Sequence, residues 1–133
     1  YIFPLDADEF IYCHSRETLD IFLKLIPQDR VGMYTWRGYL PNTTEHDPDF
    51  LYHFTDQRKE EILTPKVIIP RAIAETCTLT IGNHYVRDSN GKEIKSFVFI
   101  APNSYQFYHW FINRFSAEFI ETDELWLGHY PIR

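Results

Sequence analysis

Residues 1–10 read Tyr1-Ile2-Phe3-Pro4-Leu5-Asp6-Ala7-Asp8-Glu9-Phe10, an apolar segment that runs directly into acids. Such a segment predicts a buried strand over residues 1–5 that carries carboxylates to one edge of a sheet. Ligands of open α/β sheets bind outside the carboxyl ends of the strands. Alternate residues of an extended segment point the same way, so Asp6 and Asp8 can face one cleft. Hard carboxylate oxygens there suit magnesium, calcium or manganese. The alternative is that these acids are solvated turn residues that stabilise the N-terminus of the next helix.

The next segment has the pattern of a helix and is followed by a strand. Ser15 is the expected N-cap of a helix over residues 16–26, whose apolar residues repeat at helical spacing and which Pro27 ends. Residues 31–40 are rich in aromatic and β-branched side chains and predict a strand. Residues 41–65 form a long polar segment, which is either a functional loop or contains a short helix around residues 57–63.

The second half of the chain is richer in strand patterns. Strands are predicted over residues 66–70 and 125–130, and Asn90-Gly91 predicts a hairpin between residues 77–86 and 93–100. Between them, a helix that starts at residues 102–104 would bury one apolar face, made of Tyr108, Phe111, Ile112, Phe115 and Phe119. This order of elements predicts an α/β fold with a mixed β-sheet flanked by helices.

Length, composition and the absence of certain motifs argue against several classes of protein. The 133 residues suffice for one domain with one core, and the formal net charge of −6 disfavours nonspecific binding of nucleic acid. No apolar stretch approaches the roughly 20 residues of a membrane span. Cys13 and Cys77 show no pairing pattern and are expected to be free thiols. The motifs of P-loop hydrolases, serine hydrolases, zincins and zinc ribbons are absent from the sequence.

Two histidines and two cations are further candidates for a site. His84 and His129 each follow a glycine near an apolar segment, and either can join Asp8 as a metal ligand; a hydrogen-bonded structural histidine is the alternative. Arg133 and Lys66 are candidates for phosphate contacts, with a solvated strand end as the alternative. Aromatic rings flank the long polar segment and belong either to a sugar-binding cleft or to the core: Tyr34, Trp36, Tyr39, Tyr52 and Phe54.

Three stretches of the chain, taken together, resemble a known family. They are Phe3-Pro4-Leu5-Asp6-Ala7-Asp8-Glu9-Phe10, then Pro65-Lys66-Val67-Ile68-Ile69 with Gly82-Asn83-His84, and finally Gly128-His129-Tyr130-Pro131-Ile132-Arg133. They are similar, in this order, to segments of family-2-type glycosyltransferases of the GT-A fold, in the bacterial branch that carries Asp-Ala-Asp-Glu-Phe. The resemblance implies the C-terminal part of a GT-A nucleotide-diphospho-sugar transferase fold.

The resemblance also implies an activity and roles for residues. The enzyme would transfer a sugar from a nucleotide-diphosphate sugar to a hydroxyl of a carbohydrate or glycolipid acceptor, with inversion, as in polysaccharide biosynthesis. Asp8 and His129 would bind a divalent metal, manganese or magnesium. Asp6 would reach the ribose or help to hold the metal, Arg133 would lie near the diphosphate, and His84 would line the acceptor side. The candidates for the base are Glu45, Asp47 and Glu75, for which a solvated loop position is the alternative.

Residues 1–133 are expected to be a single domain and a fragment of a larger glycosyltransferase domain, because the family's nucleotide-binding βαβ unit precedes the Asp-x-Asp strand and is not in this sequence. Such a fragment would hold half a site and could be inactive alone. The expected location is the cytoplasm, including the inner membrane face. Two other functions stay open: a non-catalytic carbohydrate- or protein-binding module with the acids as a calcium site, and an inactive remnant of the fold.

Overall fold

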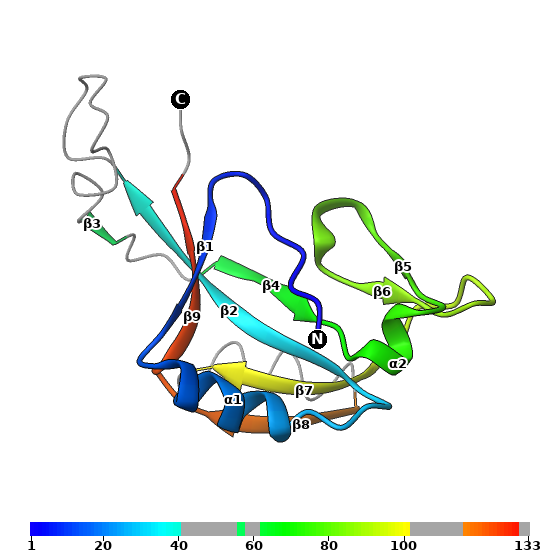
Figure 1. The fold of residues 1–133 in the computed structure, drawn as a ribbon. Coiled ribbons are helices and arrows are strands. Elements are labelled where there is room, and N and C mark those ends of the chain that lie inside the picture. The colour runs from blue at the N-terminus through cyan, green and yellow to red at the C-terminus, as the bar shows by residue number, and fades with distance from the viewer. Residues whose placement is uncertain (41–55, 58–61, 102–115, 131–133) are drawn as a thin grey trace.

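The computed structural model describes residues 1–40, 56–57, 62–101 and 116–130, and in them strands predominate (Figure 1). The main sheet has the order β1 (Glu9–Cys13), β9 (Leu125–His129), β2 (Val31–Leu40), β7 (Ser96–Ala101) and β8 (Ser116–Glu121). Two further strands, β3 (Asp56–Gln57) and β4 (Ile62–Ile68), pair with β2. A second, two-stranded sheet consists of β5 (Thr78–Leu79) and β6 (Val86–Arg87). The helical elements are α1 (Arg16–Lys24), the single turn α2 (Arg71–Ala74) and the 3-10 turn η2 (Ile81–Asn83).

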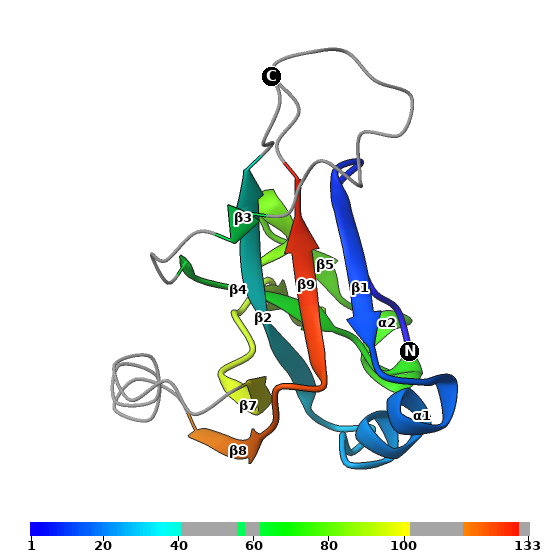
Figure 2. The ribbon, with the colours of Figure 1, turned by 90° about the vertical axis from the view of Figure 1, so that its left-hand side faces the viewer.

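The sheet is mixed, as the sequence predicts, and β2 is its centre. Over Val31–Tyr34 this strand runs parallel to β7, and over Trp36–Gly38 it runs parallel to β9. It is antiparallel to β4 and β3. Figure 2 shows β2, β9 and β1 side by side. Because β1 is antiparallel to β9, with Glu9 opposite His129, the first residues of β1 meet the last residues of β9.

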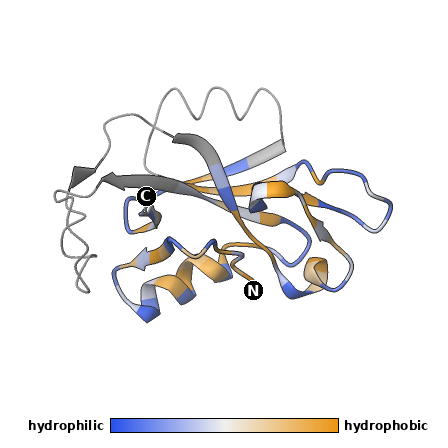
Figure 3. Ribbon diagram, turned by 90° about the horizontal axis from the view of Figure 1, so that it is seen from above, coloured by the Kyte–Doolittle hydropathy of each residue, from blue (hydrophilic) through white to orange (hydrophobic). Residues whose placement is uncertain are grey.

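The core lies on both faces of the sheet. In β7, Phe97 and Phe99 pack in one buried cluster while Val98 and Ile100 pack in the other, because successive side chains of a strand point to opposite faces. Phe22 of α1 covers the second cluster, and Val86 of β6 belongs to the first. Figure 3 shows apolar residues along α1 and the strands, with hydrophilic residues at the turns. The continuous apolar sequence of β7 is therefore that of a strand covered on both sides.

The prediction for the first helix is confirmed, and local signals explain it. Ser15 is the N-cap, and its hydroxyl accepts a hydrogen bond from the Thr18 amide at 3.1 Å. The helix ends at Lys24, two residues before the predicted end, and Ile26 packs in the core beyond it. No helix in the described part of the chain has the length and apolar character needed to cross a membrane.

The predicted strand over residues 1–5 is wrong. Only Ile2 pairs there, through an isolated bridge to Ile69 with hydrogen bonds of 2.8 and 2.9 Å, and Tyr1, Ile2 and Leu5 are exposed. The strand begins instead after the acids, at Glu9. Pro4 explains part of this difference, since proline has no amide hydrogen to continue a ladder. Asp6 and Asp8 therefore lie in the segment that leads into β1, with a turn at Ala7 and Asp8.

Three other predictions need correction. The predicted hairpin is present only next to its turn: Gly91 has a φ of 76°, and the antiparallel pairing is limited to the bridge between Arg87 and Glu93 and a hydrogen bond from the Ile94 amide to the Val86 carbonyl. The strand that pairs with β6 is β5. Gln57 lies in β3 and Leu63 in β4, so the two ends of the predicted short helix are in strands, and residues 58–61 lie outside the described residues. Phe119 lies in β8, where it stacks on Phe99 with ring centroids 5.8 Å apart. The rest of the predicted helix from residues 102–104 lies outside the described residues.

Candidate functional site

Asp8 and His129 form an ion pair or hydrogen bond at the end of the sheet where β1 begins and β9 ends. Asp8 Oδ2 lies 3.3 Å from His129 Nε2, and the two side chains are 29% and 23% exposed. The backbone holds this pair, because the Tyr130 amide donates to the Asp8 carbonyl at 2.9 Å and Glu9 is in register with His129. The two residues that the resemblance assigns to the metal are thus in contact, partly open to solvent, and come from opposite ends of the chain.

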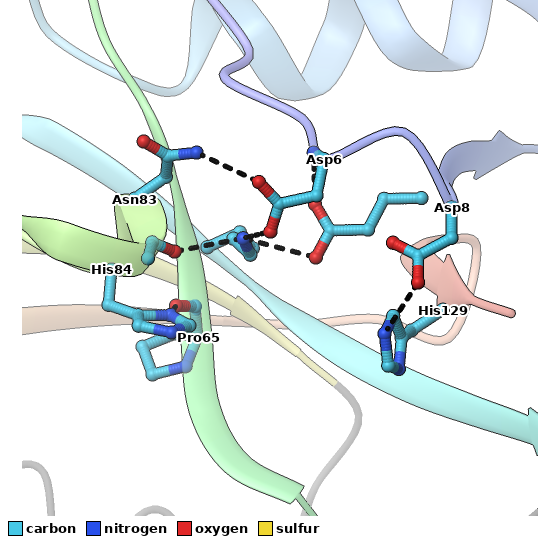
Figure 4. Close-up of polar contacts among 9 residues, drawn as sticks. Asp6, Asp8, Pro65, Asn83, His84 and His129 are labelled. Atoms are coloured by element: carbon cyan, nitrogen blue, oxygen red, sulfur yellow. Dashed lines mark hydrogen bonds and ion pairs between the residues drawn. The ribbon is translucent and has the colours of Figure 1, made fainter. Parts of the chain in front are cut away.

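Asp6 and Glu9 belong to a second cluster, centred on Lys66 of β4 (Figure 4). Lys66 Nζ donates hydrogen bonds to Asp6 Oδ2 and to the Gly82 carbonyl, both at 2.9 Å, and lies 3.1 Å from Glu9 Oε1. The side chains of Lys66 and Glu9 are each 1% exposed, whereas that of Asp6 is 53% exposed. Lys66 is therefore not at a solvated strand end. Its ammonium contacts two carboxylates and one backbone carbonyl.

The two aspartates consequently have different partners. Asp6 contacts Lys66 and accepts a 3.4 Å hydrogen bond from Asn83 Nδ2, while Asp8 contacts His129, and Figure 4 shows the two carboxylates within separate groups. The period-2 argument from an extended strand does not apply to them, because they lie outside β1.

The ring of His84 is fixed by its backbone surroundings. His84 Nδ1 lies 2.8 Å from the Pro65 carbonyl oxygen, and since a carbonyl only accepts, this nitrogen carries the proton. On the other side, a Cβ added to Gly82 would lie 2.8 Å from the Cδ2 atom of the ring. Gly82 also has a φ of 78°, so both its backbone conformation and the ring above it require glycine. His84 and Asp6 are linked in this way through Gly82, Asn83 and Lys66.

Tyr34 of β2 gives the cluster an apolar boundary. Its side chain is fully buried, Phe3 packs edge-on against its ring at 5.9 Å, and its hydroxyl has no hydrogen-bond partner among the described residues. Burial, and to a lesser extent the charge of Glu9, raises the pKa of the Tyr34 hydroxyl, which therefore stays neutral. The ion pair between Lys66 and Glu9 thus lies in surroundings of low dielectric, where charges interact strongly.

Gly128, next to His129, does not leave an open approach for a ligand. A Cβ there would lie 2.6 Å from Tyr12 Cε2 and 2.9 Å from Tyr130 Cε2. The hydroxyls of these tyrosines are hydrogen-bonded to each other, and Tyr12 stacks on Trp126 with an interplanar angle of 9°. The glycine before His129 thus makes room for rings that hold the end of β9.

We expect Gly128→Ala to lower the free energy of unfolding by about 1–3 kcal/mol, because the tyrosine rings must move. The near-ultraviolet circular dichroism of the stacked Tyr12 and Trp126 should weaken as well. Gly91→Ala is the control: its Cβ meets nothing within 4 Å, and only its positive φ opposes the change. An unchanged aromatic spectrum in Gly128→Ala would contradict this account of the glycine.

Several predicted site residues remain unplaced. Arg133 and the base candidates Glu45 and Asp47 lie outside the described residues, as do the side chains of Trp36, Tyr39, Tyr52 and Phe54. Glu75 follows α2, is exposed, and pairs with Arg71 at 3.3 Å. In the part of the chain that the structure describes, no group of three or more His, Cys, Asp or Glu side chains is placed to hold a metal ion.

Sequence reasoning missed the role of Lys66 and Glu9. The one available signal was Lys66 itself, a cation directly before the buried run Val67-Ile68-Ile69. A lysine within a buried strand needs a carboxylate partner, but which acid it meets depends on the fold.

Comparison of the chain with protein-family models, with curated proteins and with solved structures finds no match in any of the three.

Proposed function

We propose that this chain is part of a metal-dependent glycosyltransferase that transfers a sugar from a nucleotide-diphosphate sugar to a hydroxyl of a carbohydrate or glycolipid acceptor. The fold would be the C-terminal part of a GT-A fold. The observation that carries the proposal is the contact of 3.3 Å between Asp8 and His129, two residues from the first and last of the three stretches that resemble the family.

The residues present fit a divalent metal. One carboxylate oxygen and one imidazole nitrogen lie close together and partly open to solvent, and manganese or magnesium bound by so few protein groups takes its other ligands from water and substrate phosphates. A nucleoside diphosphate would supply those phosphates. Asp8 and His129 would hold the ion, and its charge would stabilise the diphosphate leaving group.

The other residues would orient the two substrates. The Tyr130 amide holds the backbone of Asp8 and His129 contacts its carboxylate, and Asp8 would bind at the donor side. His84 would line the acceptor side, with its ring orientation set by the Pro65 carbonyl. Asp6 is engaged by Lys66 and Asn83, which favours a role in positioning over direct metal binding. For the base we retain Glu45 and Asp47, since Glu75 is paired with Arg71.

The geometry favours this function over a calcium-dependent binding module. Calcium takes six to eight oxygen ligands. Of the three acids that such a site would use, Asp6 and Glu9 are both paired with Lys66, and Asp8 contacts a nitrogen. One remaining carboxylate and an imidazole are a poor calcium site.

Thermal unfolding of the full-length protein tests the proposal. We expect MnCl2 together with UDP, GDP or dTDP to raise the melting temperature by several degrees, beyond the sum of the separate effects, because ligands of the folded state stabilise it by about 2.7 kcal/mol at a hundred times Kd. A rise with calcium and free sugar, and none with manganese and any of the diphosphates, would instead indicate a lectin-like module.

A further inference from the structure

We propose that Lys66 is a positioning residue that holds the donor side and the acceptor side of the site in one fixed arrangement. The donor side is the turn of residues 6–9, which carries Asp8, and the acceptor side is the segment Gly82-Asn83-His84. This inference rests on the proposed function for the meaning of the two sides, but the link itself is a property of the fold.

The ammonium group of Lys66 joins three segments of the chain. Lys66 is on β4, its two carboxylate partners are in the turn before β1 and at the first residue of β1, and its carbonyl partner is in η2. Its ammonium donates hydrogen bonds to Asp6 Oδ2 and to the Gly82 carbonyl, and Glu9 Oε1 lies 3.1 Å away as an ion-pair partner. A buried lysine with this set of partners fixes the relative positions of all three segments.

On the donor side, Lys66 anchors the turn that carries Asp8, in addition to the hydrogen bond from the Tyr130 amide. The Asp6 amide donates to Glu9 Oε2 at 2.8 Å, and the Glu9 amide donates to the Asp6 carbonyl at 3.1 Å. The turn between them, with Asp8, is thereby closed on itself. Lys66 binds both carboxylates at the ends of this turn, so it anchors the turn as a unit to β4.

On the acceptor side, the chain has a conformation that needs support. Gly82 and Asn83 have consecutive positive φ values of 78° and 59°, a costly arrangement for the asparagine. Two contacts to the Lys66 cluster hold it: the Gly82 carbonyl accepts from Lys66, and the Asn83 amide group donates to Asp6. Because the ring of His84 rests on Gly82, a shift of this segment would move His84.

The consequence is that the two sides are coupled. If Lys66 loses its ammonium, Asp6 and Glu9 lose their shared cation and Gly82 loses its donor at once. The turn with Asp8 and the segment with His84 should then become mobile together, and the affinity for a metal at Asp8 and His129 should fall although neither ligand has changed.

The test compares Glu9→Gln with the double variant Glu9→Gln/Lys66→Met in the full-length protein. Glu9→Gln keeps only one of the two oxygens that the Asp6 amide and Lys66 contact, but this change is common to both variants, so their difference isolates the ammonium. The double change removes the ammonium without leaving the Glu9 carboxylate buried and unpaired. We expect the backbone amides of residues 9 and 83, whose acceptors are carbonyls that neither variant changes, to exchange with solvent at least about tenfold faster in the double variant than in Glu9→Gln, because local opening becomes easier. Amides of β7 should be unchanged, and Lys95→Met, at an exposed lysine, should resemble the wild type.

A second readout measures Mn2+ directly, by its electron paramagnetic resonance in the presence of UDP, GDP or dTDP. The double variant should bind Mn2+ about 10- to 100-fold more weakly than Glu9→Gln, the loss typical of residues that orient metal ligands. Faster exchange on only one side, or on neither, would overturn the proposal, as would equal Mn2+ affinity of the two variants. If the wild type itself binds no Mn2+ with any of the diphosphates while both sides still open together, the proposed function fails and the link through Lys66 stands.

Discussion

If the proposed function holds, Asp8→Asn should reduce manganese-dependent turnover of the nucleotide sugar by the full-length protein on the order of 10²- to 10³-fold, because a metal at this position would supply several kcal/mol of charge stabilisation in the transition state. The substitution keeps the size of the side chain and leaves the hydrogen bond from the Tyr130 amide to the Asp8 carbonyl in place. It also leaves the Lys66 cluster intact, since Lys66 contacts Asp6 and Glu9. Any loss can therefore be assigned to the carboxylate and not to the fold.

The measurement is the release of nucleoside diphosphate as MnCl2 is titrated. Asp20→Asn, at an exposed acid on α1, is the matched control and should behave as wild type. Combining Asp8→Asn with His129→Asn gives a second test. If both residues hold one ion, turnover by Asp8→Asn/His129→Asn should be within a small factor of turnover by Asp8→Asn alone, because the two effects are not independent. Full turnover in Asp8→Asn would remove the basis of the transferase proposal.

The elements that the sequence predicts well are those set by local signals. The first helix has a capping serine, apolar residues at helical spacing and a proline beyond its end, and all three act within a few residues. The sequence also predicts the strands β2 and β9, with β2 at the observed bounds, because aromatic and β-branched residues gather there. Local propensity decides such segments before any tertiary contact does.

The predicted elements that fail depend on contacts with distant segments. The segment Tyr1–Leu5 is as apolar as a strand, yet it makes one bridge, to Ile69. Phe119 continues a helical spacing of apolar residues, yet it lies opposite Phe99 in a strand that pairs with β7. In neither case does the sequence contain the identity of the pairing partner, which decides the outcome.

In the candidate site, too, one part could be predicted from the sequence and another part could not. The resemblance points to Asp8 and His129, and the structure brings them to 3.3 Å through the register of β1 with β9. The partnership of Lys66 with Glu9 could not be read from the chain, because it depends on β4 lying beside the turn of residues 6–9. A charged pair that is buried looks, in sequence, like two ordinary surface residues.

The second large effect concerns stability: Lys66→Met alone should lower the free energy of unfolding by about 3–5 kcal/mol, because it leaves the Glu9 carboxylate buried without a cation. The side chain of Glu9 is 1% exposed, so water cannot replace the lost ammonium without opening the structure. For a domain with a typical stability of about 5–15 kcal/mol, a loss of this size is a large fraction of the total.

The double variant Glu9→Gln/Lys66→Met should recover most of that loss, since a neutral amide beside methionine leaves no buried charge, and exchanging a buried ion pair for uncharged groups is often close to neutral in stability. Urea unfolding of the wild type, both single variants and the double variant gives the coupling energy between the two residues directly. Lys95→Met should stay within about 0.5 kcal/mol of the wild type, as an exposed lysine does. If Lys66→Met were as stable as the double variant, the Glu9 carboxylate would have to reach water in the folded protein, and the Lys66 cluster could not be the rigid, buried link between Asp8 and His84 that its contacts indicate.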